Sequence, residues 1–310
     1  METRRIGSIE VTVVGVGCNN FGGRIDEART KEVVDAAIDA GITLFDTADV
    51  YGGAGASEVL LGKALGARRD QVVVATKFGM PMGEGKAGAA PDYVRAACDD
   101  SLKRLGIDHI DLYQQHAPDA SVPIEETLGA LDELVKAGKV LEIGCSNFSP
   151  DMIDEATKAA ASRGAARFVS VQNELSLLRR KGDTGLVEAA ERNDLGILPY
   201  FPLASGLLTG KYRRGEEPPA GTRLGSAPTE RRAKALSDRN FEVLEALEGF
   251  AADRDHTLLE LAMSWLAGLP KLASVIAGAT SADQVRANAA AVGWMLTADD
   301  RTEVDRITLG

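Results

Sequence analysis

The sequence LFDTADVYGGAGASEVLLGKAL, residues 44–65, has the pattern of a buried strand followed by a helix. Its apolar run ends at Asp46, and Tyr51 follows after a short turn-forming segment. From Ser57 onward, valine and leucine recur at the spacing of one helix face. A core strand has no packing reason to end on a carboxylate. This stretch therefore predicts a strand–helix unit with a polar site where the strand ends.

The same alternation of strand and helix patterns extends over most of the chain. The expected strands are residues 11–17, 42–46, 71–77, 109–116, 140–147, 167–175, 196–201 and 272–279. The expected helices are residues 27–41, 57–65, 91–106, 123–138, 150–164, 185–194 and 281–291, with two more from about residues 241 and 258. Parallel strands joined by crossover helices form a sheet buried on both faces. Eight units in 310 residues predict an α/β fold, a closed (β/α)8 TIM barrel rather than an open sheet, and we expect residues 1–310 to form one domain.

Two segments fall outside this alternation. Residues 4–13, RRIGSIEVTV, predict a hairpin with Gly7 and Ser8 as its turn, which would cover the bottom of the barrel. A long insert after the seventh strand, at residues 203–256, indicates a lid or binding loop. We expect its residues 203–235, with the loops after Phe78 and after His116, to line a substrate pocket.

Composition excludes several classes of function. Lys and Arg number 35 against 46 Asp and Glu, for a net charge of -11. This charge and the lack of a basic stripe argue against a nucleic-acid partner. Three cysteines without paired spacing fit a reducing compartment, and no apolar run is long enough for a signal peptide or membrane span. We expect a cytoplasmic protein without a membrane partner, and no metal site.

Polar side chains end the apolar runs of several expected strands, and the mouths of barrel strands converge. Asp46, Lys77 and His116 end the second, third and fourth strands, and Tyr51 lies close to the first of these in sequence. Tyrosine is a weak acid with an ordinary pKa of about 10, and a nearby ammonium lowers that pKa. Lys77 can supply the ammonium, Asp46 can hold it, and His116 can orient a carbonyl oxygen. Such a site suits hydride addition to a carbonyl carbon, with a nicotinamide as the hydride source.

The segments that carry these residues resemble the aldo-keto reductase family. They are GITLFDTADVYGGAGASEVLLGKAL, VVVATK, LYQQH, IGCSNF, VQNEL and LASGLLTGKY, and the resemblance extends from about residue 15 to residue 288. It implies NADPH-dependent reduction of an aldehyde or ketone. It also implies that Tyr51 is the general acid, that Asp46 and Lys77 tune it, and that His116 aligns the substrate.

The resemblance further implies that NADP(H), rather than NAD(H), lies extended across the barrel mouth without a Rossmann domain. The implied contacts are Ser146, Asn147 and Gln172 at the carboxamide and Tyr200 on the nicotinamide ring. Leu203, Ser205 and Gly206 lie along the pyrophosphate with Lys211 nearby, and Gly278, Thr280, Gln284 and Asn288 lie at the adenosine. Asp46, Phe201 and Pro202 are further implied cofactor contacts. Gly17, Cys18 and Asn19 at the first strand's mouth are further candidate contacts.

The adenosine end departs from the family pattern. Residues 278–281 contain no Lys or Arg, where many relatives place a cation for the 2′-phosphate, and Ala287 replaces a frequent glutamate. The preference for NADP(H) therefore depends on Arg223 in the insert. Ser281 and Gln284 also have the spacing of a helix capping box, and capping and nucleotide binding are compatible at a helix N-terminus.

Two other functions use the same residues. One is a nucleotide-sensing or regulatory subunit with weak turnover, because channel-associated members of the superfamily resemble this chain along its length. The other is a dehydrogenase that oxidises a sugar or polyol. The complete set of Tyr51, Asp46, Lys77 and His116 favours catalysis. The expected partner is a small carbonyl or sugar substrate, and the family implies a monomer or small homo-oligomer.

Overall fold

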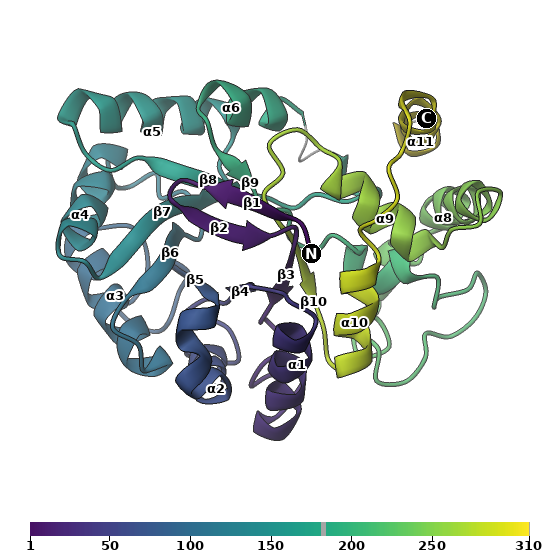
Figure 1. Cartoon of the computed structure of the whole chain (residues 1–310), viewed down its shortest axis with the longest axis horizontal. Helices are drawn as coiled ribbons and strands as arrows, with labels where there is room; N and C mark the ends of the chain where they lie inside the picture. The colour runs from purple at the N-terminus through teal and green to yellow at the C-terminus, as the bar shows by residue number, and fades with distance from the viewer. Residues whose placement is uncertain (181–183, 310) are drawn as a thin grey trace.

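The computed structural model describes residues 1–180 and 184–309, and its centre is a curled sheet of eight parallel strands in the order β10-β3-β4-β5-β6-β7-β8-β9 (Figure 1). The strands are β3 (Val14–Gly17), β4 (Leu44–Asp46), β5 (Val73–Phe78), β6 (Ile110–Gln115), β7 (Val140–Ser146), β8 (Phe168–Gln172), β9 (Gly196–Ile197) and β10 (Val275–Gly278). The two edges meet where Ile197 N donates to Lys271 O at 2.8 Å and Ala273 N donates to Ile197 O at 2.9 Å. The predicted (β/α)8 barrel is confirmed.

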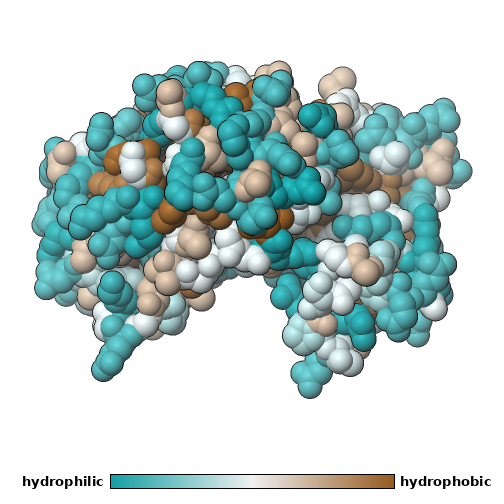
Figure 2. Space-filling view, turned by 90° about the horizontal axis from the view of Figure 1, so that it is seen from below, coloured by the Kyte–Doolittle hydropathy of each residue, from teal (hydrophilic) through white to brown (hydrophobic). Residues whose placement is uncertain are grey.

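Helices connect the strands and cover the outside of the sheet (Figure 1). The helices that alternate with strands are α1 (Glu27–Asp39), α2 (Ala56–Leu65), α3 (Pro91–Leu105), α4 (Ile124–Lys136), α5 (Pro150–Arg163), α6 (Leu186–Arg192), α9 (Leu258–Ala267) and α10 (Ala282–Ala290). A short 3-10 helix, η1 (Gly66–Gln71), follows α2. The strands are buried on both faces by this arrangement, which explains their nearly continuous apolar runs. Figure 2 shows a mostly hydrophilic outer surface with a hollow between two projecting parts.

The predicted N-terminal hairpin is present as β1 (Thr3–Ile6) and β2 (Ile9–Thr12), with Gly7 at a φ of +56° in the turn. It lies across one end of the barrel (Figure 1), where Ile6, Ile9 and Val11 pack with side chains from the barrel interior. The expected first strand at residues 11–17 is wrong in its first part. The Thr12 hydroxyl donates to Val14 O, and the chain leaves the hairpin there before it enters β3.

The seventh strand is shorter than residues 196–201, because only Gly196–Ile197 pairs as a strand. Pro199 has no N–H to donate, and beyond Ile197 only separate contacts remain: Leu198 N donates to Val171 O, and Tyr200 makes an isolated bridge with Glu174. The insert after it holds η3 (Ala204–Thr209), α7 (Thr229–Ala235) and α8 (Asp238–Ala252). The sequence did not predict α7, and it placed the start of α8 too late, because the Ser237 hydroxyl caps that helix. A final helix, α11 (Ala298–Leu309), was not predicted either.

Two helix glycines provide a matched test of the packing outside the barrel. A Cβ on Gly62 in α2 would lie 2.0 Å from Leu105 O at the end of α3, whereas a Cβ on Gly129 in α4 would meet nothing within 4 Å. Gly62→Ala should therefore lower the free energy of unfolding by about 1–3 kcal/mol, through overpacking. Gly129→Ala should raise it by about 0.5–1 kcal/mol, through helix propensity. Urea denaturation measures both, and equal effects of the two substitutions would contradict the close α2–α3 packing.

Candidate active site

The residues that the sequence selected as catalytic meet at the C-terminal mouth of the barrel. Asp46 is the last residue of β4, Lys77 lies near the end of β5, and His116 directly follows β6. Tyr51 lies in the turn between β4 and α2. Parallel strands deliver their C-terminal ends to one face, so residues distant in sequence become neighbours.

A buried ion pair forms the base of this site. Lys77 Nζ lies 2.6 Å from Asp46 Oδ2, 2.9 Å from Thr47 O and 3.5 Å from the Tyr51 hydroxyl, and the Lys77 side chain is 0% exposed. Burial alone lowers the pKa of Lys77, but the charge of Asp46 and the nearby phenol outweigh it, so the pKa is raised. Lys77 is therefore an ammonium with all three donors directed at oxygen.

Two buried amides hold the other oxygen of the carboxylate. Gln114 Nε2 donates to Asp46 Oδ1 at 3.1 Å, and Gln172 Nε2 donates to the same oxygen at 2.9 Å. Gln172 Nε2 also lies 3.3 Å from Gln114 Oε1. The sequence assigned Gln172 to a cofactor carboxamide and did not select Gln114. Strand alternation could have identified Gln114 as a site residue, because a residue two positions before His116 points to the same side of the strand.

The phenol of Tyr51 stays protonated in this site. Burial raises the pKa of Tyr51, the charge of Lys77 lowers it in part, and Asp46 raises it again, with a net rise above its usual value. The expectation that Lys77 brings the pKa of Tyr51 below its ordinary value is therefore wrong. Loss of hydration disfavours the phenolate more than one ammonium, already paired with a carboxylate, favours it. Tyr51 is therefore a protonated phenol at neutral pH.

His116 is neutral in the same surroundings. Burial, and secondly the charge of Lys77, lower the pKa of His116 to about 3. Its ring meets the Tyr51 ring edge-on at a centroid distance of 5.7 Å, and its Nδ1 is buried without a hydrogen-bond partner. A neutral imidazole beside a phenol can donate one N–H to an oxygen placed between them.

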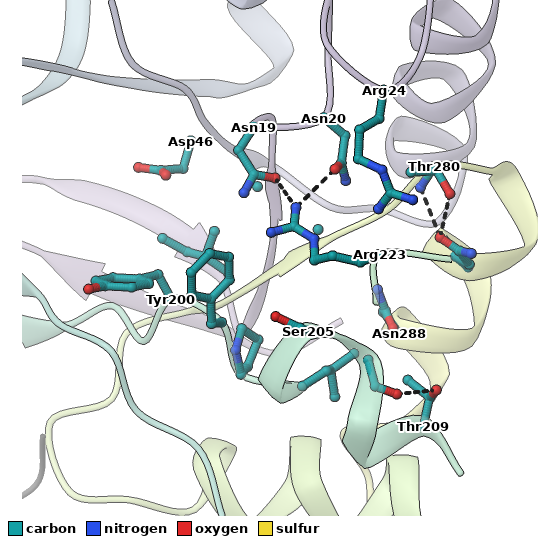
Figure 3. Close-up of a pocket in the computed structure, with 18 of the residues that line it drawn as sticks. Asn19, Asn20, Arg24, Asp46, Tyr200, Ser205, Thr209, Arg223, Thr280 and Asn288 are labelled. Carbon is teal, nitrogen blue, oxygen red and sulfur yellow. Dashed lines mark hydrogen bonds between the residues drawn. The ribbon is translucent and has the colours of Figure 1, made fainter. Parts of the chain in front are cut away.

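A cavity of about 710 Å³ opens from these residues across the barrel mouth (Figure 3). Except for Cys18, every residue that the sequence selected for cofactor binding lines it: Gly17, Asn19, Asp46, Ser146, Asn147, Gln172, Tyr200, Phe201, Pro202, Leu203, Ser205, Gly206, Lys211, Arg223, Gly278, Thr280, Gln284 and Asn288. The Cys18 side chain is 0% exposed. The cavity is also lined by residues that the sequence did not select for cofactor binding: Asn20, Arg24, Thr209, Ala220, Gly221, Thr222, Leu259, Ile276 and Ala287.

The tyrosine after β9 is anchored by an asparagine. The Tyr200 hydroxyl donates to Asn147 Oδ1 at 2.8 Å, and Asn147 Nδ2 donates to His116 O at 2.9 Å. Asn147 has a φ of +63°, a conformation that asparagine tolerates better than most residues. The orientation of the Tyr200 ring is thus coupled to the backbone at His116.

The expected capping box at α10 is only half formed. Ser281 Oγ accepts a hydrogen bond from Gln284 N at 3.4 Å, as the cap requires. Gln284 Oε1, however, accepts from Thr280 N at 2.8 Å rather than from the backbone of the capping serine. The Gln284 side chain therefore closes the loop before α10 and lines the cavity at the same time.

Residues 1–180 and 184–309 contain no group of three His, Cys, Asp or Glu side chains that could hold a metal ion. Within the same ranges, every helix is too short or too polar to span a membrane.

Residues 13–308 match the model of the Aldo/keto reductase family. The chain is 37% identical over 304 residues to "Probable aldo-keto reductase 1" of Glycine max, covering 95% of this chain and 85% of that protein. It is 33% identical over 285 residues to "L-glyceraldehyde 3-phosphate reductase" of Escherichia coli K12, with 88% and 82% covered. It is 36% identical over 274 residues to "Aldo-keto reductase yakc [NADP(+)]" of Schizosaccharomyces pombe, with 85% and 78% covered.

The neutral state of His116 predicts a specific pH dependence of stability. The unfolded chain takes up a proton at a histidine near pH 6.5, whereas the folded pKa of His116 is about 3. The stability due to the neutral ring is complete above the unfolded pKa and is lost as the pH falls toward the folded one. Between about pH 7.5 and about pH 5 the wild type should lose about 2 kcal/mol more than His116→Gln.

Urea denaturation of both proteins at the two pH values measures this difference, and the comparison cancels other titrating groups. A parallel pH dependence of the two proteins would mean that His116 protonates normally in the folded state.

Proposed function

Since the chain belongs to the aldo-keto reductase family and is an NAD(P)H-dependent oxidoreductase, we propose that it reduces an aldehyde or ketone to the alcohol with NADPH, and that Tyr51 donates the proton. The observation that carries the proposal is the Tyr51 hydroxyl, 3.5 Å from a buried ammonium at one end of a large cavity. Two relatives support the substrate class and the cofactor, because one is an L-glyceraldehyde 3-phosphate reductase and the other carries NADP(+) in its name.

The cavity fits a phosphorylated dinucleotide. Arg24, Lys211 and Arg223 line it, and within the described part of the chain none of the three has a carboxylate partner within 4 Å. Cations without acidic partners in a cavity favour phosphate groups. Ser146 and Asn147 would hold the carboxamide, Tyr200 the nicotinamide ring, and the cations the phosphates, with Thr280, Gln284 and Asn288 at the adenosine. The nicotinamide, when bound, supplies the hydride.

The protonation states of the site fit proton donation by Tyr51. A carbonyl oxygen that gains negative charge becomes a strong acceptor for the phenolic proton. The phenolate left behind lies beside Lys77, whose ammonium is fixed by Asp46 and cannot turn away. Lys77 thus stabilises the phenolate as it forms, rather than lowering the pKa of the resting phenol.

His116 would orient the substrate as a neutral donor. Its depressed pKa keeps the ring uncharged at neutral pH. A neutral ring can donate an N–H to the carbonyl oxygen without competing with Tyr51 as an acid. The edge-on contact with Tyr51 places both groups on one side of the cavity, where a single oxygen can reach both.

Replacement of the phenol tests the proposed acid. Tyr51→Phe keeps the ring and removes the proton, so kcat for reduction of 4-nitrobenzaldehyde should fall by roughly 10²–10⁴-fold. The fall in NADPH absorbance measures the rate, and NADPH titration should give an affinity close to that of the wild type. Unchanged turnover in Tyr51→Phe would reject the acid role.

A substrate screen separates the proposed reductase from the two other functions. An absence of wild-type turnover on a broad carbonyl panel, with NADPH still bound, would favour a sensing subunit. Faster oxidation of sugars or polyols with NAD+ than reduction of aldehydes with NADPH would favour a dehydrogenase.

Replacement of the buried amine tests the role of its charge. Lys77→Met keeps a flexible side chain of similar length but removes the ammonium that stabilises the phenolate. Reduction should be abolished while NADPH affinity stays nearly unchanged, because Lys77 does not line the cavity. Rates and affinities are measured by the same two assays. Loss of affinity together with activity would mean that Lys77 is structural, with the unpaired Asp46 disrupting the site.

A further inference from the structure

Charge is distributed unevenly along the cavity. Asp46 is the only carboxylate among the described residues that line it, and it is already bound to Lys77. Figure 3 shows Asp46 and Tyr200 at one end, and Arg24 with Thr280 at the other. The end away from the proposed reaction site is therefore positively charged and has no acid of its own.

The middle of the cavity contains Arg223 and the turn at Ser205 (Figure 3). Arg223 Nη2 donates to Asn20 Oδ1 at 3.0 Å and approaches Asn19 Oδ1 at 3.4 Å, and the guanidinium lies over the Phe201 ring. Ser205 and the following glycine have φ values of +61° and +92°. Lys211 lies beside this turn, since a Cβ on residue 206 would come 2.8 Å from its Nζ. These groups are placed for the pyrophosphate that any nicotinamide dinucleotide carries.

Arg24 occupies a different position. It comes from the loop after β3, and its Nη2 donates to Gly221 O at 2.8 Å. A guanidinium has five N–H donors, so several remain for a ligand. The charge of Arg24 contributes to lowering the pKa of both Lys211 and Arg223, after burial as the main cause. Arg24 is therefore near the other two cations, with no acid among the described residues to neutralise it.

The remaining groups at the Arg24 end are neutral. Thr280 and Gln284 are hydrogen-bonded to each other, and Asn288 is an amide. Residues 278–281 contribute no cation. A phosphate on the adenosine would have to find its positive partner across the cavity, on the loop that carries Arg24.

We propose that Arg24 binds the 2′-phosphate of the adenosine ribose and so determines the preference for NADP(H) over NAD(H). This inference rests on the proposed function, because it assumes a dinucleotide with its nicotinamide beside Tyr51. It reassigns the discriminating contact, which the sequence gave to Arg223. In the structure Arg223 lies at the middle of the cavity. There it would bind the pyrophosphate, which both cofactors contain.

Binding of NADP+ and NAD+ to the full chain, measured by titration calorimetry, tests the assignment without turnover. Arg24→Gln removes one charge-assisted contact to the 2′-phosphate, which should raise the Kd for NADP+ by about 10- to 100-fold. The Kd for NAD+ should change by less than about twofold, because NAD+ lacks that phosphate. The Kd for adenosine 2′,5′-bisphosphate should rise by a similar factor to that for NADP+. Because this fragment has no nicotinamide, such a result would assign the effect to the phosphate end.

Two matched variants complete the experiment. Arg223→Gln should raise the Kd for NADP+ and the Kd for NAD+ by the same factor. Arg29→Gln removes the same charge from an exposed residue of α1 that pairs with Glu32 and does not line the cavity, so it should change neither Kd.

The outcomes separate this inference from the proposed function. Equal weakening of both dinucleotides in Arg24→Gln, a preference for NADP+ that survives the substitution, or equal affinities in the wild type would each overturn the role of Arg24 while leaving a dinucleotide site. Failure of the wild type to bind either dinucleotide would instead reject the proposed function.

Discussion

The buried ion pair between Lys77 and Asp46 is the constraint on which the rest of the site depends. An ammonium that is 0% exposed is costly unless its charge is matched and all its donors are used. Asp46, the carbonyl of Thr47 and the Tyr51 hydroxyl meet that demand. Because the carboxylate must also be satisfied, two glutamines from β6 and β8 donate to its second oxygen. The barrel brings four strands' ends together around one charge.

Burial raises the pKa of Tyr51 but lowers the pKa of His116, and this difference is chemically useful. The same desolvation keeps the phenol of Tyr51 protonated and the imidazole of His116 neutral, whereas Lys77 stays charged because a carboxylate faces it. One small volume thus holds an acid, a neutral donor and a cation at the same pH. Groups with pKa values pushed apart by their surroundings are the usual basis for assigning acid and base roles.

The sequence predicted the strand–helix alternation and the residues at the strand ends, because periodicity and polarity are local properties. It failed where a single residue decides the outcome, as at Pro199, which lacks an N–H just after β9, and at Thr12, whose hydroxyl bonds to Val14 O between the hairpin and β3. It also failed for the direction of the pKa shift of Tyr51. That direction depends on how deeply the phenol is buried, which the sequence does not show. Gln114 was visible in the pattern only once His116 was known to face the same side. Arg24 was missed because its loop shows no periodicity, and only the folded chain brings it to the end of the cavity that holds Thr280.

The charge of the cavity opposes that of the whole chain, and the local charge decides what binds there. The net charge is -11, which disfavours an anion at long range. Salt at physiological strength screens exposed charges beyond about 8 Å, so the distant acids have little effect inside the cavity. After burial, the charge of Arg24 contributes to lowering the pKa of both Lys211 and Arg223, so these cations act on one another inside the cavity. An acidic protein can therefore present a positive cavity, provided that Asp46, the one carboxylate among the described residues that line it, is paired with Lys77. The same ion pair thus supports the proposed proton donor, Tyr51, at one end and keeps the cavity favourable for a polyanion along its length.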